Sequence, residues 1–448
     1  MARKESLRMI LQCAVFAVVM LGCVAPASAI PAFARKYSLR CTACHESWPV
    51  LNDFGRAFRD NGYQIRLGKD DTVTADPGYW PVAVHITPNY NYTKVTNQPT
   101  DEGAKSIGSG GVADASIDLL MAGVLTPNIS FLVVPTGFAS DGNVHLESYW
   151  AYFSRVFKDS DWFNIRLGQF EIDLPASSHR GIFLTDGYLL YSYHPAVFQP
   201  GVGMAPGSNI AGYDMGQNQR GAEFIGHDAT DSTRYAVSVF SAYDSLGSAN
   251  GLSSPSVYGH LQKYFHFKDG PVSEAEVGIW GVQANYPTQF LTLGGAPIPG
   301  SGSHLQASSR YGVEANLWVG PTVAPLHLDL VYGHGEDRKD LLLGADRAGT
   351  WNGGFFEALW VPPADLLHWT LFARYDWIRN QNQPLVSAPS DFNNQDQYTL
   401  GLRYTIAYSI RDEVAFHGEI SSGNIKGVGF AGMDQRTDSI MLGVDFAY

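Results

Sequence analysis

The sequence predicts an all-β protein, a transmembrane outer-membrane β-barrel of about sixteen antiparallel strands behind a short, mostly helical N-terminal segment. Two observations predict this fold. Between Val82 and Tyr448, apolar and polar residues alternate in segments of about ten residues, which is the period of a strand with one apolar face. The connections tend to alternate between short turns and longer loops, which is the asymmetry of the two rims of such a barrel.

The N-terminal residues have the features of an export signal. Basic residues precede an apolar run over 9–24, and Ala27-Ser28-Ala29 forms a small-residue cleavage site. The run is too short and wrongly flanked for a membrane-spanning helix. We therefore expect a signal peptide over 1–29, a separate N-terminal segment over 30–79 and the barrel over 80–448.

The segment after the signal contains the motif Cys41-Thr42-Ala43-Cys44-His45. In c-type haem attachment, two cysteines at this spacing add to the haem vinyl groups and the adjacent histidine ligates the iron. The other two cysteines lie in the signal. The alternatives are a local disulfide, a thioredoxin-like pair, which would open a helix in a βαβ unit, and half a zinc site, which would need further ligands nearby. We expect one covalent haem c on Cys41 and Cys44, with His45 as the proximal ligand.

A short helix is expected after this motif. Ser47 can cap it, and Asn61-Gly62 can end it in a left-handed conformation. Its apolar stripe is either an ordinary core face or a surface that packs on the haem; the aromatic candidates for haem packing are Trp48, Phe54 and Phe58. The basic residues of the segment either pair with haem propionates or form a solvated or lipid-facing patch; they are Arg35, Lys36, Arg40, Arg56 and Arg59.

The sixth iron ligand must come from the barrel or be absent. No histidine lies between His45 and His85, and no methionine follows the signal before Met121. Alternation over 82–86 points His85 into the lumen near the periplasmic end, whereas Met121 shares the lipid face of its apolar neighbours. His85 is therefore the candidate distal ligand, with a polar lining role as the alternative. Four further histidines are also expected to face the lumen: His145, His260, His327 and His417.

The strands and connections of the barrel can be placed from the same alternation. The strands are expected near 82–93, 113–125, 129–139, 145–157, 162–172, 220–227, 233–243, 256–267, 273–285, 304–318, 325–337, 350–361, 367–379, 397–409, 412–423 and 437–448. Short turns over 126–128, 158–161, 268–271 and 362–365 mark the periplasmic rim. Long loops are expected over 94–112, 174–219 and 380–396, of which 174–219 is expected to constrict the lumen.

The composition agrees with an exported barrel that lies in outer-membrane lipid. Charged residues make up only 16% of the chain, and the formal net charge of −13 argues against a nucleic-acid partner. Six tryptophans near strand ends or on strands are candidates for aromatic girdles, with ordinary packing as the alternative: Trp80, Trp150, Trp162, Trp360, Trp369 and Trp377.

Several segments of the N-terminal region resemble one bacterial family. The residues over 30–35, 41–45, 48–58 and 61–63, followed by a porin-length barrel, resemble the fused monohaem cytochrome-porins of the outer membrane. The best-known members of that family oxidise ferrous iron. The resemblance implies that Cys41 and Cys44 carry the haem and that His45 is the proximal ligand. This chain has Tyr37-Ser38 where the iron oxidases tend to have Thr-Gly, so the iron substrate stays open.

The function that the resemblance implies is electron transfer across the outer membrane. An extracellular metal ion or mineral, with Fe(II) as the candidate, would donate electrons that reach a periplasmic cytochrome, and an Fe(II):cytochrome c oxidoreductase activity would follow. Three alternatives stay open: outward transfer to extracellular acceptors, a solute porin with a haem-bearing plug, and peroxidase-like chemistry at an open sixth position.

Overall fold

The computed structural model describes residues 32–39, 43–47, 49–65, 70–75, 81–100, 102–113, 117–137, 144–157, 160–183, 187–195, 198–199, 203–204, 214–228, 230, 232–241, 255–287, 292–293, 296–297, 305–320, 326–339, 345–362, 369–408 and 413–447. The expected signal peptide lies outside these residues, as do Cys41, Arg40, Trp48 and Trp80.

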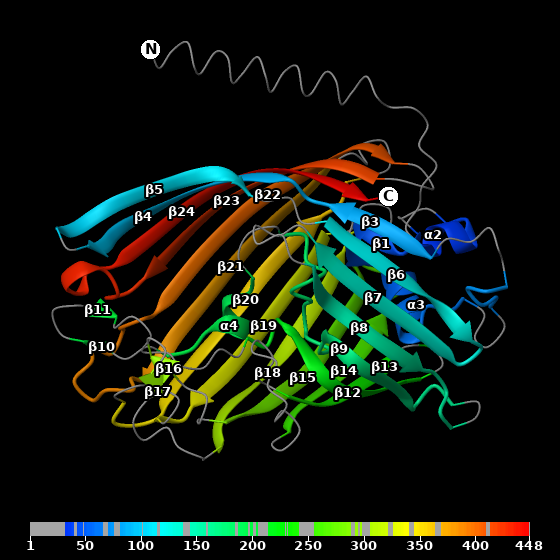
Figure 1. The fold of residues 1–448 in the computed structure, drawn as a ribbon, viewed down its shortest axis with the longest axis horizontal. Helices are drawn as coiled ribbons and strands as arrows, with labels where there is room; N and C mark the ends of the chain where they lie inside the picture. Colours follow the sequence, from blue (N-terminus) through cyan, green and yellow to red (C-terminus); the bar gives the residue numbers. More distant parts are fainter. Residues whose placement is uncertain are drawn as a thin grey trace, which may run out of the picture.

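Sixteen antiparallel strands of the described chain close into a barrel, which confirms the predicted fold class (Figure 1). The strand elements are β3 (Val82–Ile86), β4 (Asn89–Thr100), β5 (Gly103–Ala113), β6 (Ile117–Thr126), β7 (Ile129–Gly137), β8 (His145–Phe153), β9 (Asn164–Glu171), β12 (Asn218–His227), β13 (Thr233–Ser241), β14 (Ser256–His266), β15 (Val272–Pro287), β18 (Leu305–Val319), β19 (Leu326–Asp337), β20 (Gly349–Trp360), β21 (Trp369–Asn382), β22 (Gln395–Tyr408), β23 (Glu413–Ile425) and β24 (Gln435–Ala447).

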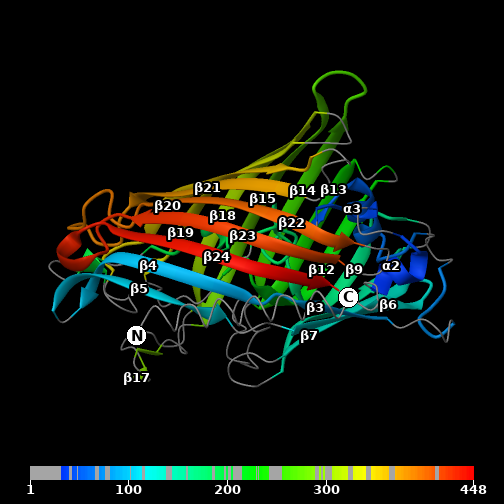
Figure 2. The same cartoon turned by 90° about the horizontal axis from the view of Figure 1, so that it is seen from above.

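Two of the sixteen strands are interrupted. The last strand, β24, pairs with β3 near its end and with β4 along most of its length, so β3 and β4 form one strand of the wall. β3 pairs in turn with β6, and β4 pairs with β5, so β5 and β6 form the second interrupted strand. The predicted long loop over 94–112 is therefore wrong, because β4 and β5 pair as a hairpin over these residues and β4 also pairs with β24 (Figures 1 and 2).

The barrel wall has an apolar exterior and a polar or aromatic interior. Along β14, Val257 and Leu261 are exposed, whereas Tyr258, His260 and Gln262 between or beside them are buried. This alternation is that of a wall with lipid on one side. Among the described residues, no helix is both long and apolar enough to cross a membrane. The protein is an integral outer-membrane protein.

The tryptophans divide between the two sides of the wall. Trp162, Trp360 and Trp369 are exposed outside, as a girdle requires. Trp150 instead lies in a large aromatic cluster of the interior, so a girdle position is wrong for it. Tyr152, two residues further along β8, is also buried, so both side chains lie on the inner face of the strand.

The segment between β9 and β12 folds into the lumen, as the sequence predicted. It contains the short helix α4 (Leu189–Ser192), which lies inside the barrel in Figure 1. The hydroxyl of Tyr188 donates to Glu357 of β20 over 2.9 Å, and that of Tyr193 donates to Asn380 of β21 over 2.8 Å. These contacts hold the segment against the opposite wall and fill the middle of the lumen with side chains.

The smaller elements complete the fold. Two short strand pairs lie in connections, β10 (Phe198–Gln199) with β11 (Gly203–Met204) and β16 (Thr292–Leu293) with β17 (Ala296–Pro297). A 3-10 turn, η5 (Phe430–Gly432), precedes β24. The N-terminal segment contains α2 (Ala32–Tyr37), β1 (His45–Ser47), β2 (Val50–Leu51) and α3 (Asp53–Asp60), which we call the plug.

The plug occupies the rim where the turns are short. Glu46 accepts a hydrogen bond from Trp318 at the end of β18 over 2.6 Å, and the backbone of Val73 bonds to Val124 at the end of β6 over 2.9 Å. Each of these barrel residues stands beside one of the short connections. The plug therefore lies at the periplasmic mouth, at the end of the barrel where β24 ends (Figure 1).

Candidate functional site

A cavity of about 330 Å³ separates the plug from the barrel wall. Cys44 and His45 line it from the plug, and β3, β6, β7, β8 and β9 line it from the wall. This volume lies in the range of about 300–1,000 Å³ that is usual for small-molecule and cofactor sites. The predicted motif thus borders a cofactor-sized space rather than bulk solvent.

The backbone of the motif sets the orientation of His45. His45 begins β1, which pairs with β2 through His45 and Leu51. Its Nδ1 lies 3.0 Å from the carbonyl oxygen of Pro49. Since a carbonyl only accepts, Nδ1 carries the hydrogen, and the lone pair is on Nε2. A backbone carbonyl that holds Nδ1–H in this way is typical of histidines that ligate metals through Nε2.

Burial shapes the chemistry of both motif residues. Desolvation lowers the pKa of His45 to about 4, which outweighs its backbone hydrogen bonds and the charge of Glu413. Burial also raises the pKa of the Cys44 thiol to about 11. The imidazole is therefore neutral at ordinary pH, which is the form that binds a metal.

Helix α3 packs directly against the motif. Its N-cap is Asn52, whose side-chain oxygen accepts from the backbone of Gly55 over 2.9 Å. The predicted cap Ser47 is wrong, because Ser47 lies in β1 and contacts Thr370 of the wall over 3.0 Å. A Cβ at Gly55 would lie 2.0 Å from the carbonyl oxygen of Cys44, so only glycine permits this approach. The helix ends at Asn61 and Gly62, as predicted, and Gly62 has a φ of +68°.

Aromatic side chains form one wall of the cavity. Phe58 lies there and is 7% exposed, and its ring meets that of Phe33 edge-on at 5.2 Å between centroids. Tyr63 stacks on Phe33 at 4.7 Å and on Trp150 of the barrel at 5.6 Å. Phe54, a predicted haem-packing residue, is instead 43% exposed and does not line the cavity.

Three histidines of the described chain line the cavity, namely His45, His85 and His179. His85 faces it from β3, as alternation predicted, and its Nδ1 lies 3.4 Å from Asp118. His179 comes from the segment that folds into the lumen, and its Nδ1 lies 3.3 Å from Glu147. Met121 faces outward, because its neighbours Leu120 and Ala122 line the cavity.

The other predicted lumen histidines do not line this cavity. His260, His327 and His417 are buried inside the barrel, where carboxylates contact each of them. His145 lies at the start of β8, where it is exposed and pairs in register with Thr136 of β7.

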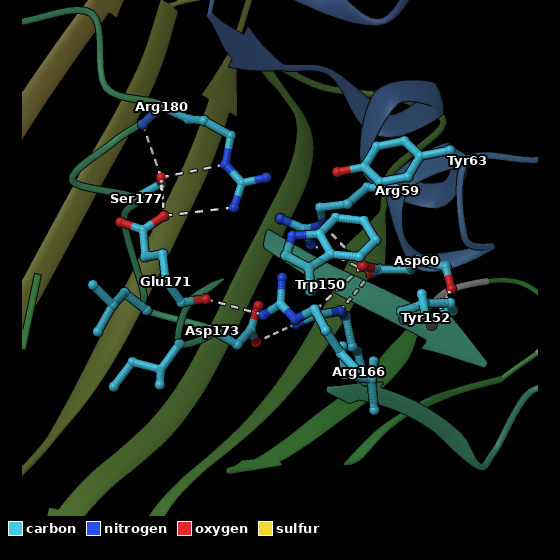
Figure 3. A pocket seen from close by; sticks show the side chains of 14 residues that line it. Arg59, Asp60, Tyr63, Trp150, Tyr152, Arg166, Glu171, Asp173, Ser177 and Arg180 are labelled. Atoms are coloured by element: carbon cyan, nitrogen blue, oxygen red, sulfur yellow. Dashed lines mark hydrogen bonds and ion pairs between the residues drawn. The ribbon is translucent and has the colours of Figure 1, made fainter. Parts of the chain in front are cut away.

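Among the described residues, three guanidinium groups line the cavity: Arg59 from the plug, Arg166 from β9 and Arg180 from the lumen segment. All three also border a smaller neighbouring pocket of about 30 Å³, which Figure 3 shows. Of the basic residues proposed from the sequence that the structure describes, Arg59 alone lines the cavity. Arg56 instead pairs with Glu274 over 2.7 Å, and Arg35 donates to the carbonyl of Val82. The sequence did not single out Arg166, Arg180 or His179. The prediction that 174–219 enters the lumen was the one signal that could have led to His179 and Arg180.

Buried ion pairs join the plug to the wall beneath the cavity. Asp60, at the end of α3, contacts Arg59 over 2.9 Å and also pairs with Arg234 of β13. Arg234 pairs in turn with Asp173, and the Tyr152 hydroxyl donates to the backbone of Asp60 over 2.6 Å. Burial alone would raise the pKa of Asp60, but Arg234 and Arg59 outweigh it and hold the pKa at about 2.

The turn that carries His179 is fixed by one carboxylate. Glu171 is 5% exposed, and its oxygens accept from the backbone of Ser178 over 2.6 Å and from that of His179 over 3.2 Å. Arg180 lies 3.5 Å from the same carboxylate (Figure 3). A second cavity of about 220 Å³, lined by polar groups that include Ser192, Asp214 and Arg374, also has His179 in its wall.

Comparisons with known proteins support the barrel fold. No protein-family model and no curated protein matches the chain. The anion-selective porin from Comamonas acidovorans is similar in structure, with a TM-score of 0.51 and 14% identity over 82% of this chain and 99% of that chain. The outer membrane channel DcaP of Acinetobacter baumannii has a TM-score of 0.47 and 9% identity over 82% of this chain and 97% of that chain. OprB of Pseudomonas putida has a TM-score of 0.46 and 11% identity over 90% of this chain and 99% of that chain.

Proposed function

We propose that this chain is an outer-membrane electron-transfer protein that holds one c-type haem, attached to Cys41 and Cys44, at the periplasmic mouth of its barrel. The observation that carries the proposal is the placement of Cys44 and His45 on a cofactor-sized cavity. The donor set agrees with it, because a neutral imidazole with its Nδ1–H held by Pro49 presents Nε2 for iron. When bound, the haem supplies reversible one-electron exchange.

The residues around the motif have distinct roles in this proposal. His45 would ligate the iron, and the apolar walls, including Phe58 and Trp150, would exclude water from it. Arg59, Arg166 and Arg180 would neutralise the propionates, since guanidinium groups bind carboxylates with two parallel hydrogen bonds. Arg180 is the best placed of the three, because its nearest carboxylate oxygen, on Glu171, lies as far as 3.5 Å away.

The proposed partners follow from the two ends of the barrel. The plug lies at the short-turn rim, where a soluble periplasmic cytochrome could approach it. An extracellular metal ion or mineral, with Fe(II) as the candidate, would donate from the other side. Outward transfer to extracellular acceptors would use the same site, because a haem exchanges one electron reversibly.

The first test is haem content. The full chain, expressed with a c-type maturation system, should carry one covalent haem per chain, and Cys41→Ser with Cys44→Ser should abolish it. Rapid mixing of the oxidised protein with Fe(II) under anaerobic conditions should then reduce the haem, and the absorbance bands of reduced c-type haem should appear. A protein that is reduced by dithionite but not by Fe(II) would rule out the iron donor and favour outward transfer.

A solute porin is the second candidate function, and the shared fold with an anion-selective porin favours it. The plug at one rim and the buried aromatic cluster in the lumen oppose it, since a water-filled channel needs a polar lumen. Planar-bilayer recording of the full chain decides between the two. We expect little or no steady conductance; a stable open channel in a protein without covalent haem would establish the porin instead.

A further inference from the structure

His179, on the segment that folds into the lumen, is the residue that we propose as the distal ligand of the haem iron, in place of His85. This inference rests on the proposed function and goes beyond it, because it names the sixth ligand and the element that supplies it. Among the described residues that line the cavity, histidines are the side chains suited to this position, and no methionine is present there.

The two candidates lie on different sides of the cavity. His45 is close to the wall formed by β21, β22 and β23, since Ser47 of the same short strand contacts Thr370 of β21 over 3.0 Å and the charges of Glu413 and Arg403 act on His45. His85 lies on the same side, because it pairs in register with Ala447 of β24, the next strand. The cavity extends from there toward β8 and β9, where His179 lies beside Glu147 and Glu171.

The two axial ligands of a haem must approach from opposite faces of the porphyrin. In the order of the barrel, β8 is separated from β24 by the strands that contain β3, β6 and β7. His179 would therefore reach a haem held by His45 from across the cavity, whereas His85 would reach it from the side on which His45 itself lies. His85 and His179 each have a carboxylate near Nδ1, so hydrogen bonding does not distinguish them as distal ligands. Their positions in the cavity do.

The surroundings of His179 suit a ligand. Glu147 lies 3.3 Å from its Nδ1, and a carboxylate that holds one ring nitrogen directs the other to the metal. Ligation then requires the loss of the proton on Nε2 while Nδ1 keeps its own. The buried Glu171 fixes the backbone of the turn at Ser178 and His179, so the imidazole is held before any group binds.

His179 also borders the second cavity, on the lumen side of the turn. Arg374 of β21 and Ser192 of α4 line that cavity together with it. The proposed ligand thus belongs to the element that separates the haem site from the rest of the lumen. A change in that segment would alter the iron's sixth ligand directly.

The test is spectroscopic and uses the full-length protein with covalent haem. Wild type should give a low-spin ferric spectrum by electron paramagnetic resonance and optical absorbance. His179→Ala should keep its covalent haem, become high-spin, bind carbon monoxide when reduced, and return to low spin with added imidazole. The matched control, His85→Ala, should stay low-spin.

Further outcomes decide the remaining cases. If His179→Ala folds poorly, His179→Met should give the long-wavelength absorbance band of a sulfur-ligated ferric haem. A high-spin wild type, or a low-spin His179→Ala beside a high-spin His85→Ala, would overturn the assignment while leaving the electron-transfer function in place. Absence of covalent haem in wild type would overturn the proposed function itself.

Discussion

The guanidinium group of Arg234 on β13 contacts both oxygens of Asp60 at the end of α3, with Nη2 3.2 Å from Oδ1, and both side chains are almost fully buried. Residues 174 positions apart are joined by this pair. It is an electrostatic link between the plug and the wall, and Arg234 also pairs with Asp173. Loss of one partner of such a pair leaves an uncompensated buried charge.

We expect Arg234→Met to lower the free energy of unfolding by about 3–5 kcal/mol, because Asp60 and Asp173 then lie buried with less compensation. Urea unfolding of the detergent-solubilised protein measures this. Arg436→Met, which removes an exposed pair with Asp438, is the control and should cost at most about 1 kcal/mol. Equal costs for the two variants would contradict the role of the buried pair.

Docking of the plug should depend on pH in an acidic window. The folded-state pKa of Asp60 is about 2, below its ordinary value, so its contribution to stability is present above about pH 4 and is lost as the pH falls toward 2. An acid-active protease should cleave the plug faster as the pH falls from about 4 toward 2. In Asp60→Asn the rise should be smaller; an identical rise would show that another group is responsible.

Gly55→Ala should disturb the haem-attachment motif. Its Cβ would lie 2.0 Å from the Cys44 carbonyl, so α3 or the motif must move, at a cost of about 1–3 kcal/mol. We expect lower stability and several-fold less covalent haem, measured by thermal unfolding and by the pyridine haemochrome assay. Gly259→Ala on β14 is the matched control, since nothing lies within 4 Å of its added Cβ, and it should change neither quantity.

The two candidate caps of α3 can be compared directly. Asn52→Ala removes the hydrogen bond to Gly55 and one to the carbonyl of Ala43, and should cost about 1 kcal/mol or more. Ser47→Ala removes one hydroxyl contact with Thr370 and should cost less. Thermal unfolding of the two variants measures the difference; a larger loss for Ser47→Ala would contradict the assigned cap.

The sequence by itself determined the barrel and the attachment motif, because both are local patterns. Strand alternation depends only on which face of the wall meets lipid, so it located most of the strands, although not β5, and pointed His85 inward. The motif over 41–45 has a spacing that covalent chemistry requires, whatever the surrounding fold.

Tertiary structure alone decided how the lumen is filled. Trp150 faces inward, Asn52 caps α3 in place of Ser47, and Arg166, Arg180 and His179 converge on the cavity. Each position depends on contacts between segments far apart in the chain, such as Glu147 with His179 or Asp60 with Arg234. Local periodicity carries no information about such contacts, because a loop that enters a barrel has no repeating face to read.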